Sequence, residues 1–113
     1  MSAFAVAVID ETRFGPEIKQ YLEQIDATLT PFDGTFRVHG GPYEKYEGNW
    51  ASDLVVIEFP TIEQARSWYH SSAYARIKSL RTDNTEGTLF LVEGVPDSHR
   101  ATDLLVPSRA SNK

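Results

Sequence analysis

The sequence contains no cysteine, which excludes a disulfide framework, thiolate metal ligands and a cysteine nucleophile. It also lacks an apolar run approaching the ~20 residues that a membrane-spanning helix requires. Basic residues are scattered and outnumbered: 11 Lys and Arg stand against 16 Asp and Glu, for a formal net charge of −5. Because cations must neutralise phosphates, this balance argues against nucleic acid and membranes as partners. We expect a soluble, cytoplasmic protein.

The motifs of the commonest enzyme sites are missing as well. The chain contains no G-x-S-x-G, no G-x-G-x-x-G and no Walker lysine loop, which removes the usual hydrolase, dinucleotide and nucleotide sites. The three histidines, His39, His70 and His99, are far apart in sequence and form neither H-x-H nor H-E-x-x-H. We therefore expect no metal and no cofactor.

A strand followed directly by a helix is predicted just past the middle of the chain. Leu54–Phe59 is short and mostly branched or aromatic, which indicates a strand buried on both faces. Pro60 cannot donate to a sheet and ends this strand. Thr61 and Gln64 have the spacing of a capping box, so a helix is expected to begin at Ile62.

Two helices follow from the apolar spacing after this corner. The first carries its apolar side chains on one stripe, at Ile62, Ala65, Trp68 and Tyr69. Ser71 and Ser72 offer a second cap. The helix after them places four residues on or near one face: Tyr74, Ile77, Leu80 and Arg81.

The other elements are predicted by the same rules. Ala3–Ile9 is apolar on both faces and is expected to be a central strand. Pro16 is well placed as the first residue of an amphipathic helix, whose apolar positions recur as far as Leu29. Thr35–His39 and Thr88–Glu93 read as two further strands.

The turn after the first helix and the strand that follows it carry specific expectations. Pro31 stops or kinks the helix, and Gly34 suits the left-handed residue past its end. In the strand, Phe36 and Val38 are expected to point one way and His39 the other.

The order β-α-β-β-α-β predicts an α+β, ferredoxin-like protomer: an antiparallel four-stranded sheet with both helices on one face. Residues 1–95 form this single domain, and residues 96–113 are expected to be a C-terminal tail or dimer arm that docks its apolar triplet Leu104-Leu105-Val106 on a neighbour.

Such a sheet has one face that its own helices leave open. We expect the covered face to carry Phe36, Val38, Val55, Ile57 and Phe59. The opposite face is then expected to carry Leu54, Val56, Leu89 and Leu91. An apolar surface of this kind exceeds the few hundred Å² that a soluble monomer tolerates, so we predict an obligate homodimer in which a second copy covers it.

Four segments together resemble a known family: HGGPYEKYEGNW, VVIEFPTIEQARSWYHSSAY, LR and EGTLFLVEG. In this order they are similar to the domain of unknown function 1330 family of the dimeric alpha-plus-beta barrel superfamily, over about residues 3 to 95. The chain departs from the usual pattern in having Asp33-Gly34 for a Gly-Gly pair and His39 where an arginine is frequent.

The resemblance implies a ferredoxin-like protomer, a face-to-face dimer and no established general reaction. Related families in the superfamily include cofactor-free oxygenases, muconolactone isomerase-like enzymes, haem proteins and stress-related proteins. Fold alone does not choose among them.

Two residues are the candidate catalytic groups. His39 ends a strand beside a glycine pair, and imidazole exchanges protons readily near neutral pH. Arg81 could hold a carboxylate or enolate with its planar fork. The alternatives are a strand-end histidine bonded to backbone or water and an arginine in a structural ion pair.

Further candidates form a possible ligand site between sheet and helices: Trp50, Glu58, Trp68, Tyr69 and Tyr74. The aromatic rings would line a pocket and their polar tips would orient a planar ligand. Arg37, Glu58 and Glu93 could meet Arg81 near one end of the sheet, or Arg37 and Glu58 could form an ion pair that fixes strand register. Trp68 and Tyr69 also suit an ordinary core.

The leading hypothesis is a homodimer that binds a small planar or carboxylated molecule between sheet and helices. One alternative is a noncatalytic structural or stress-related dimer without a ligand. Another is a cofactor-free oxygenase or isomerase-like enzyme, in which His39 accepts a proton and Arg81 holds the resulting anion.

Overall fold

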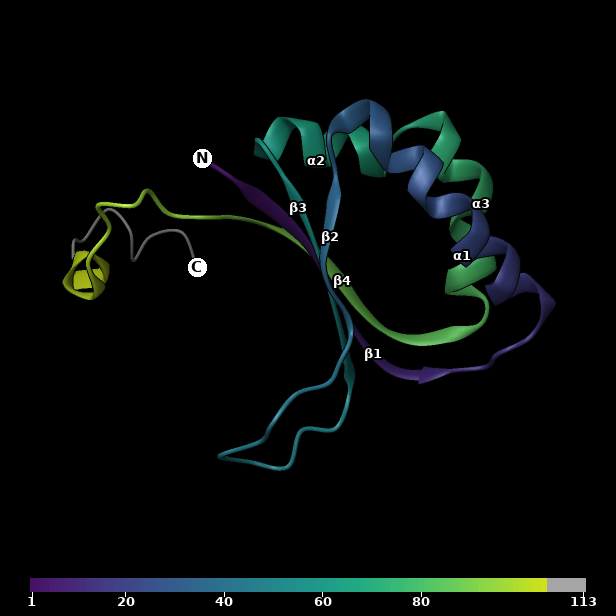
Figure 1. Ribbon diagram of the computed structural model, residues 1–113, viewed down its shortest axis with the longest axis horizontal. Coiled ribbons are helices and arrows are strands. Elements are labelled where there is room, and N and C mark those ends of the chain that lie inside the picture. The colour runs from purple at the N-terminus through teal and green to yellow at the C-terminus, as the bar shows by residue number, and fades with distance from the viewer. Residues whose placement is uncertain (106–113) are drawn as a thin grey trace.

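A computed structural model describes residues 1–105 of the 113-residue chain. Its elements in order are β1 (Ala3–Thr12), α1 (Pro16–Leu29), the 3-10 turn η1 (Thr30–Phe32), β2 (Thr35–Gly40), β3 (Asp53–Phe59), α2 (Ile62–Tyr69), α3 (Ser72–Thr82), β4 (Thr85–Glu93) and the 3-10 turn η2 (Ala101–Leu105). The strands form one antiparallel sheet in the order β2-β3-β1-β4. All three α-helices lie on one face of it (Figure 1). The predicted α+β protomer is confirmed.

The helices begin where the sequence predicts. The Thr61 side chain accepts a hydrogen bond from the Gln64 amide (3.1 Å) at the start of α2, and Ser71 accepts from the Tyr74 amide (3.2 Å) at the start of α3. The Gln64 side chain is used differently from a capping box. Its amide nitrogen donates to the Phe32 carbonyl (3.3 Å), which ties α2 to η1.

Gly34 is not the left-handed residue past the end of α1, contrary to the prediction from sequence. Asp33 takes the left-handed conformation (φ 59°), which short polar side chains tolerate. Gly34 is needed for space, because a Cβ there would lie 2.8 Å from both Leu29 Cδ2 and Phe59 Cε1. This close approach lets the end of α1 pack against the end of β3.

The faces of the sheet are set by β1, whose residues alternate in burial. Ala3, Ala5 and Ala7 are buried toward the helices, while the residues between them point to the other face. In the register of the sheet, Leu89 and Leu91 lie opposite Ala7 and Ala5. Leu89 and Leu91 therefore face the helices, which corrects the expectation that they lie on the open face.

A bulge in β2 causes the second correction. Phe36 pairs with Ile57 on the helix side, and the register then shifts so that Val38 pairs with Val56 and His39 with Val55. The extra residue turns Val38 to the open face and His39 to the helix side. The prediction that Val38 accompanies Phe36 is wrong for this reason.

Strands β1 and β4 are longer than their apolar runs. They continue as a pair through a second irregularity between Ile9 and Glu11, where Glu11 comes opposite Glu86. Arg13 compensates these like charges, because its Nη1 lies 3.3 Å from Glu86 Oε2 and 3.7 Å from Glu11 Oε2. The predicted boundaries at Ile9 and Thr88 underestimate both strands.

Beyond β4 the chain leaves the body of the domain and forms η2, in the yellow part of the ribbon (Figure 1). The turn is held by local hydrogen bonds, including one from the Arg100 amide to Asp103 Oδ2 (3.2 Å). Leu104 and Leu105 are 65% and 79% exposed. Val106, the last member of the predicted apolar triplet, lies outside the described residues.

Candidate functional site

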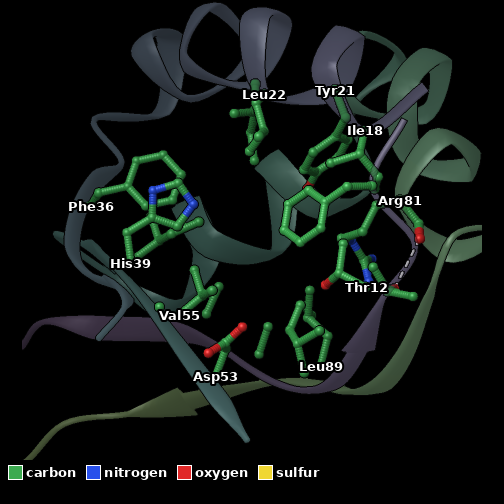
Figure 2. A pocket seen from close by; sticks show the side chains of 18 of the residues that line it. Thr12, Ile18, Tyr21, Leu22, Phe36, His39, Asp53, Val55, Arg81 and Leu89 are labelled. Carbon is green, nitrogen blue, oxygen red and sulfur yellow. Dashed lines mark hydrogen bonds between the residues drawn. The ribbon is translucent and has the colours of Figure 1, made fainter. Parts of the chain in front are cut away.

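A cavity of about 250 Å³ lies between α1 and the helix-side face of the sheet. Figure 2 shows Leu22 reaching into it from α1, with His39 and Arg81 on opposite sides. Most of the wall is apolar and is made by Ala5, Ala7, Ile9, Phe14, Ile18, Leu22, Ile25, Phe36, Val55, Ile57, Trp68 and Leu89. Its polar lining comes from Thr12, Tyr21, His39, Asp53, Arg81 and Thr85.

The cavity exists because the middle of the sheet carries small side chains. Ala5 and Ala7, on the central strand β1, project only a methyl group each toward α1. The α1 residues above them recur at helical spacing, with Ile18, Tyr21 and Ile25 all buried. Methyl groups below and a helix above leave room that larger strand residues would fill.

One end of the cavity is a chain of polar groups anchored in the core. Arg81 Nε donates to the Tyr74 hydroxyl (3.3 Å), and the Tyr74 and Tyr21 oxygens are 2.7 Å apart. The two rings meet edge to face, with centroids 6.2 Å apart. The end of α3 is fixed by Thr85, whose hydroxyl donates to the Arg81 carbonyl (2.9 Å). Arg81 is thereby held at the cavity wall.

No carboxylate in the described part of the chain balances the charge of Arg81. Arg81 is half-buried, and among residues 1–105 no Asp or Glu oxygen lies within 4 Å of its guanidinium. Burial acts to lower the pKa of Arg81, but the Tyr74 and Tyr21 hydroxyls raise it, and the net pKa is raised. Burial, followed by the influence of Tyr74, raises the pKa of Tyr21. At neutral pH the site therefore presents the Arg81 cation and the neutral Tyr21 hydroxyl.

The other end of the cavity is lined by two exposed polar side chains, His39 and Asp53. The bulge in β2 brings His39 onto the wall, where its ring stacks on Phe36 with centroids 4.6 Å apart. Asp53, the first residue of β3, lines the same side, and both side chains are exposed. A carboxylate and an imidazole therefore stand across the cavity from Arg81 (Figure 2).

Of the residues predicted from sequence, His39, Trp68 and Arg81 line the cavity. Trp68 forms part of the wall, and its indole N–H donates to Thr28 Oγ1 (3.0 Å). Tyr74 is fully buried behind the wall and reaches the site through Arg81 and Tyr21. The structure places these four residues close together, with Tyr74 in the layer beneath the wall.

The other three predicted residues lie elsewhere. Tyr69 packs against Trp68 and has Lys78 Nζ 4.6 Å from its ring centroid. Trp50 is 43% exposed and packs against Tyr43 in the loop between β2 and β3, which extends away from the helices (Figure 1).

Glu58 points to the opposite face of the sheet, where it accepts a hydrogen bond from Arg37 Nε (2.8 Å). This is the register-fixing ion pair. Glu58 and Arg37 do not meet Arg81, and Glu58 does not line the cavity.

Sequence reasoning missed Tyr21 and Asp53. The signal for Tyr21 was a hydroxyl within the apolar stripe of α1, a position that an ordinary core residue also occupies. Asp53 is the first residue of β3, whose second residue, Leu54, pairs with Gly40, next to His39. Recognising Asp53 requires the pairing of β2 with β3.

Between residues 1 and 105, no group of three His, Asp or Glu side chains is arranged to hold a metal ion. No helix in the same range has the length and apolar character to cross a membrane.

Comparisons with known proteins address the family and the fold. The family model described as "Domain of unknown function (DUF1330)" matches residues 2–95. The structure is similar to that of RPA0582, a protein of unknown function from Rhodopseudomonas palustris, with a TM-score of 0.64 at 11% identity over 84% of this chain and 83% of that one. Its methylated form gives 0.64 at 10% identity, over 87% and 84% of the two chains.

Rv0793 from Mycobacterium tuberculosis is also similar, with a TM-score of 0.50 at 12% identity over 88% of this chain and all of that one. At these identities the likeness concerns the fold alone. No protein of curated function matches the chain.

Proposed function

We propose that this chain, which belongs to the DUF1330 family of domains of unknown function, binds a small planar or carboxylated molecule in the cavity between the sheet and α1. The observation that carries the proposal is Arg81, a half-buried cation on an apolar cavity wall that has no Asp or Glu oxygen of residues 1–105 within 4 Å. Removing a charge from water is costly unless a partner compensates it, and a ligand carboxylate is a partner that fits the guanidinium fork.

The cavity limits the size and character of the ligand. Its volume of about 250 Å³ is below the ~300–1,000 Å³ typical of drug-sized sites. A single ring or short apolar body with one anionic group suits these dimensions. The apolar walls would bury that body while Arg81 meets the anionic group.

The proposal is tested with benzoate as the probe, by calorimetry and thermal shift on the full chain. The variant Arg81→Met keeps an apolar stem and removes the charge, and we expect it to bind benzoate at least about tenfold more weakly than wild type. Arg76→Met is the matched control, because Arg76 is exposed on the same helix and does not line the cavity.

Binding to the native state raises the melting temperature with ligand concentration. If benzoate leaves the wild-type melting temperature unchanged, or if Arg81→Met binds it as tightly as wild type does, the proposal fails.

A second candidate function is cofactor-free proton transfer, which the position of His39 on the cavity wall favours. His39 would take a proton from an acidic carbon of the bound acid, and the charge left on the enolate oxygen would be stabilised by Arg81. Phenylpyruvate in D₂O is a suitable probe, because deuterium replaces its acidic hydrogens as it enolises. We expect His39→Ala to abolish any enhancement by the protein, and unchanged exchange would remove His39 from the mechanism.

We also propose that the protein is a homodimer joined through the open face of the sheet. Eight apolar residues point to this face: Phe4, Val6, Val8, Val38, Leu54, Val56, Phe90 and Val92. Val38, Phe90 and Val92 are 36%, 45% and 43% exposed in the single chain. A second copy of the same face would cover all eight residues, since a two-fold interface joins identical surfaces.

The exposed leucines of η2 support the proposal that the tail is an arm which contacts the partner. Leu104 and Leu105 remain largely exposed on their own chain. A chain ending at residue 95 is expected to keep the fold and the cavity and to dimerise more weakly. Sedimentation at a series of concentrations measures this, and an unchanged dimer constant would remove the arm from the interface.

A further inference from the structure

We infer that Tyr21 is the hydrogen-bond donor that selects an oxyanion in the cavity, and that Tyr74 is a positioning residue that aims it. This inference rests on the proposed function and specifies the ligand class: a molecule with an anionic oxygen, either a carboxylate or an enolate, on an apolar body. A neutral or donor-bearing group in its place would be bound less well.

The direction of the hydrogen bonds carries the inference. Arg81 Nε–H can only donate, so the Tyr74 oxygen is the acceptor of that bond. Tyr74 is 0% exposed, and within residues 1–105 the Tyr21 oxygen is the acceptor in reach of its hydroxyl hydrogen. The Tyr74 hydroxyl therefore donates to Tyr21, 2.7 Å away. The order of donation is Arg81 to Tyr74 to Tyr21.

Because the Tyr21 oxygen accepts from Tyr74, the hydroxyl hydrogen of Tyr21 is not used in the bond between the two tyrosines. Tyr21 lines the cavity, whereas Tyr74 does not, so the cavity is the space toward which that hydrogen can turn. The charge of Arg81 polarises both hydroxyls, and hydrogen bonds in a chain strengthen one another. Burial raises the pKa of Tyr21, which keeps this hydrogen in place at physiological pH.

Donors then converge on one part of the cavity. The Arg81 guanidinium donates through Nε to Tyr74 and also interacts with the Tyr21 oxygen, and it lines the cavity beside the Tyr21 hydroxyl. A site with hydroxyl and guanidinium hydrogens favours an acceptor with negative charge and disfavours an ammonium or amide N–H.

The experiment compares benzoate with benzamide, which has the same ring and nearly the same shape but no charge. Affinities are measured by calorimetry for wild type, Tyr21→Phe, Tyr74→Phe and Tyr69→Phe. Tyr69→Phe is the matched control: Tyr69 packs in the same aromatic cluster and contributes no hydrogen bond within the described range. Circular dichroism checks that each variant is folded.

We expect Tyr21→Phe to weaken the binding of benzoate roughly tenfold and that of benzamide less than about threefold, because a charge-assisted hydrogen bond is the stronger one. The ratio of the benzoate affinity to the benzamide affinity therefore falls. Tyr74→Phe should lower this ratio by a smaller factor, since the Tyr21 hydroxyl remains but is free to rotate. Tyr69→Phe should leave the ratio unchanged. A change in ratio identifies a polar role, because simple loss of packing would weaken both ligands equally.

The inference is overturned if wild type binds benzoate, Arg81→Met does not, and Tyr21→Phe keeps the wild-type ratio. That pattern would leave the proposed function standing. If wild type binds neither probe, the proposed function itself fails and the inference fails with it. Should Tyr74→Phe prove unfolded, the ratio measured for Tyr21→Phe alone decides. The phenylalanine ring at position 21 fills the same space as the tyrosine ring.

Discussion

The two faces of the central strand β1 differ in the size of their side chains, and the smaller side chains lie on the face that the helices cover. On β1, the residues that face the helices are the small ones, Ala3, Ala5 and Ala7, while the alternate residues on the open face are larger. Small side chains beneath α1 leave a cavity, and large side chains on the open face leave an apolar surface. One strand therefore contributes both to a candidate ligand site and to a candidate interface.

The largest effect is expected from a charge in the middle of the open face. Val6 pairs with Val56 on one side and Phe90 on the other, so Val6→Glu would bury two unpaired carboxylates in a symmetric dimer. We expect dimerisation to weaken at least about 100-fold, since an unpaired buried charge costs several kcal/mol. Light scattering at a series of concentrations measures the change.

Ala27→Glu supplies the control, because Ala27 is exposed on α1 and the added charge is the same. Val6→Glu should retain its benzoate affinity if the two faces act independently. Equal masses for the two variants would refute the assignment of the open face to dimerisation.

The next largest effect concerns the closely packed end of the covered face. Gly34→Ala places a methyl group 2.8 Å from Leu29 and Phe59 side-chain atoms, and we expect a loss of ~1–3 kcal/mol in the free energy of unfolding. Urea denaturation at a fixed protein concentration measures it. Gly15→Ala is the control: a Cβ there meets nothing within 4 Å and its φ of 174° is extended. If both variants are equally stable, this end is not close-packed.

Filling the cavity should affect ligand binding rather than stability. Ala7→Leu adds apolar volume where there is space, so we expect little loss of stability but about a tenfold loss of benzoate affinity, roughly 1.4 kcal/mol. Val8→Leu adds a methylene group to the neighbouring residue on the other face and should leave the affinity unchanged. Wild-type binding by Ala7→Leu would show that the ligand lies elsewhere.

The smallest effect is expected at the ion pair on the open face. The Ser2 hydroxyl, and then the Arg37 guanidinium, lower the pKa of Glu58 below its usual 4.5. A lowered pKa in the folded state stabilises the protein above the unfolded-state value, and this contribution is lost as pH falls through the folded-state value.

Wild type should therefore lose slightly more stability than Glu58→Gln between pH 7 and pH 3. Urea midpoints of the two proteins at both pH values provide the measurement. Parallel pH dependences would show that the pair contributes nothing to stability.

Much of the protomer could be predicted from local rules. Thr61 and Ser71 cap their helices as their spacing indicates, and the interval from Tyr74 to Arg81 predicts that Arg81 lies near the sheet. These features depend on neighbours in sequence, which is why they are accessible without a structure. The family resemblance is confirmed by the match over residues 2–95.

The errors arise where pairing between strands decides orientation. In Thr88–Glu93 both alternate sets are apolar, so which set faces the helices depends on register with β1. The bulge in β2 reverses Val38 and His39, and no residue pattern in that strand announces it. His39 reached the cavity through this bulge. The places of Tyr21 and Asp53 on the cavity wall likewise depend on tertiary contacts.

Methyl NMR with a neutral paramagnetic relaxation agent, recorded with and without benzoate, tests the division between the two faces most directly. We expect benzoate to shift the methyl signals of Val55 and Leu89 in the cavity. We expect the signals of Val6, Val56 and Val92 to be insensitive to benzoate and protected from the agent, because a second copy covers them. Fast relaxation of the open-face methyls, or benzoate shifts confined to them, would contradict the account.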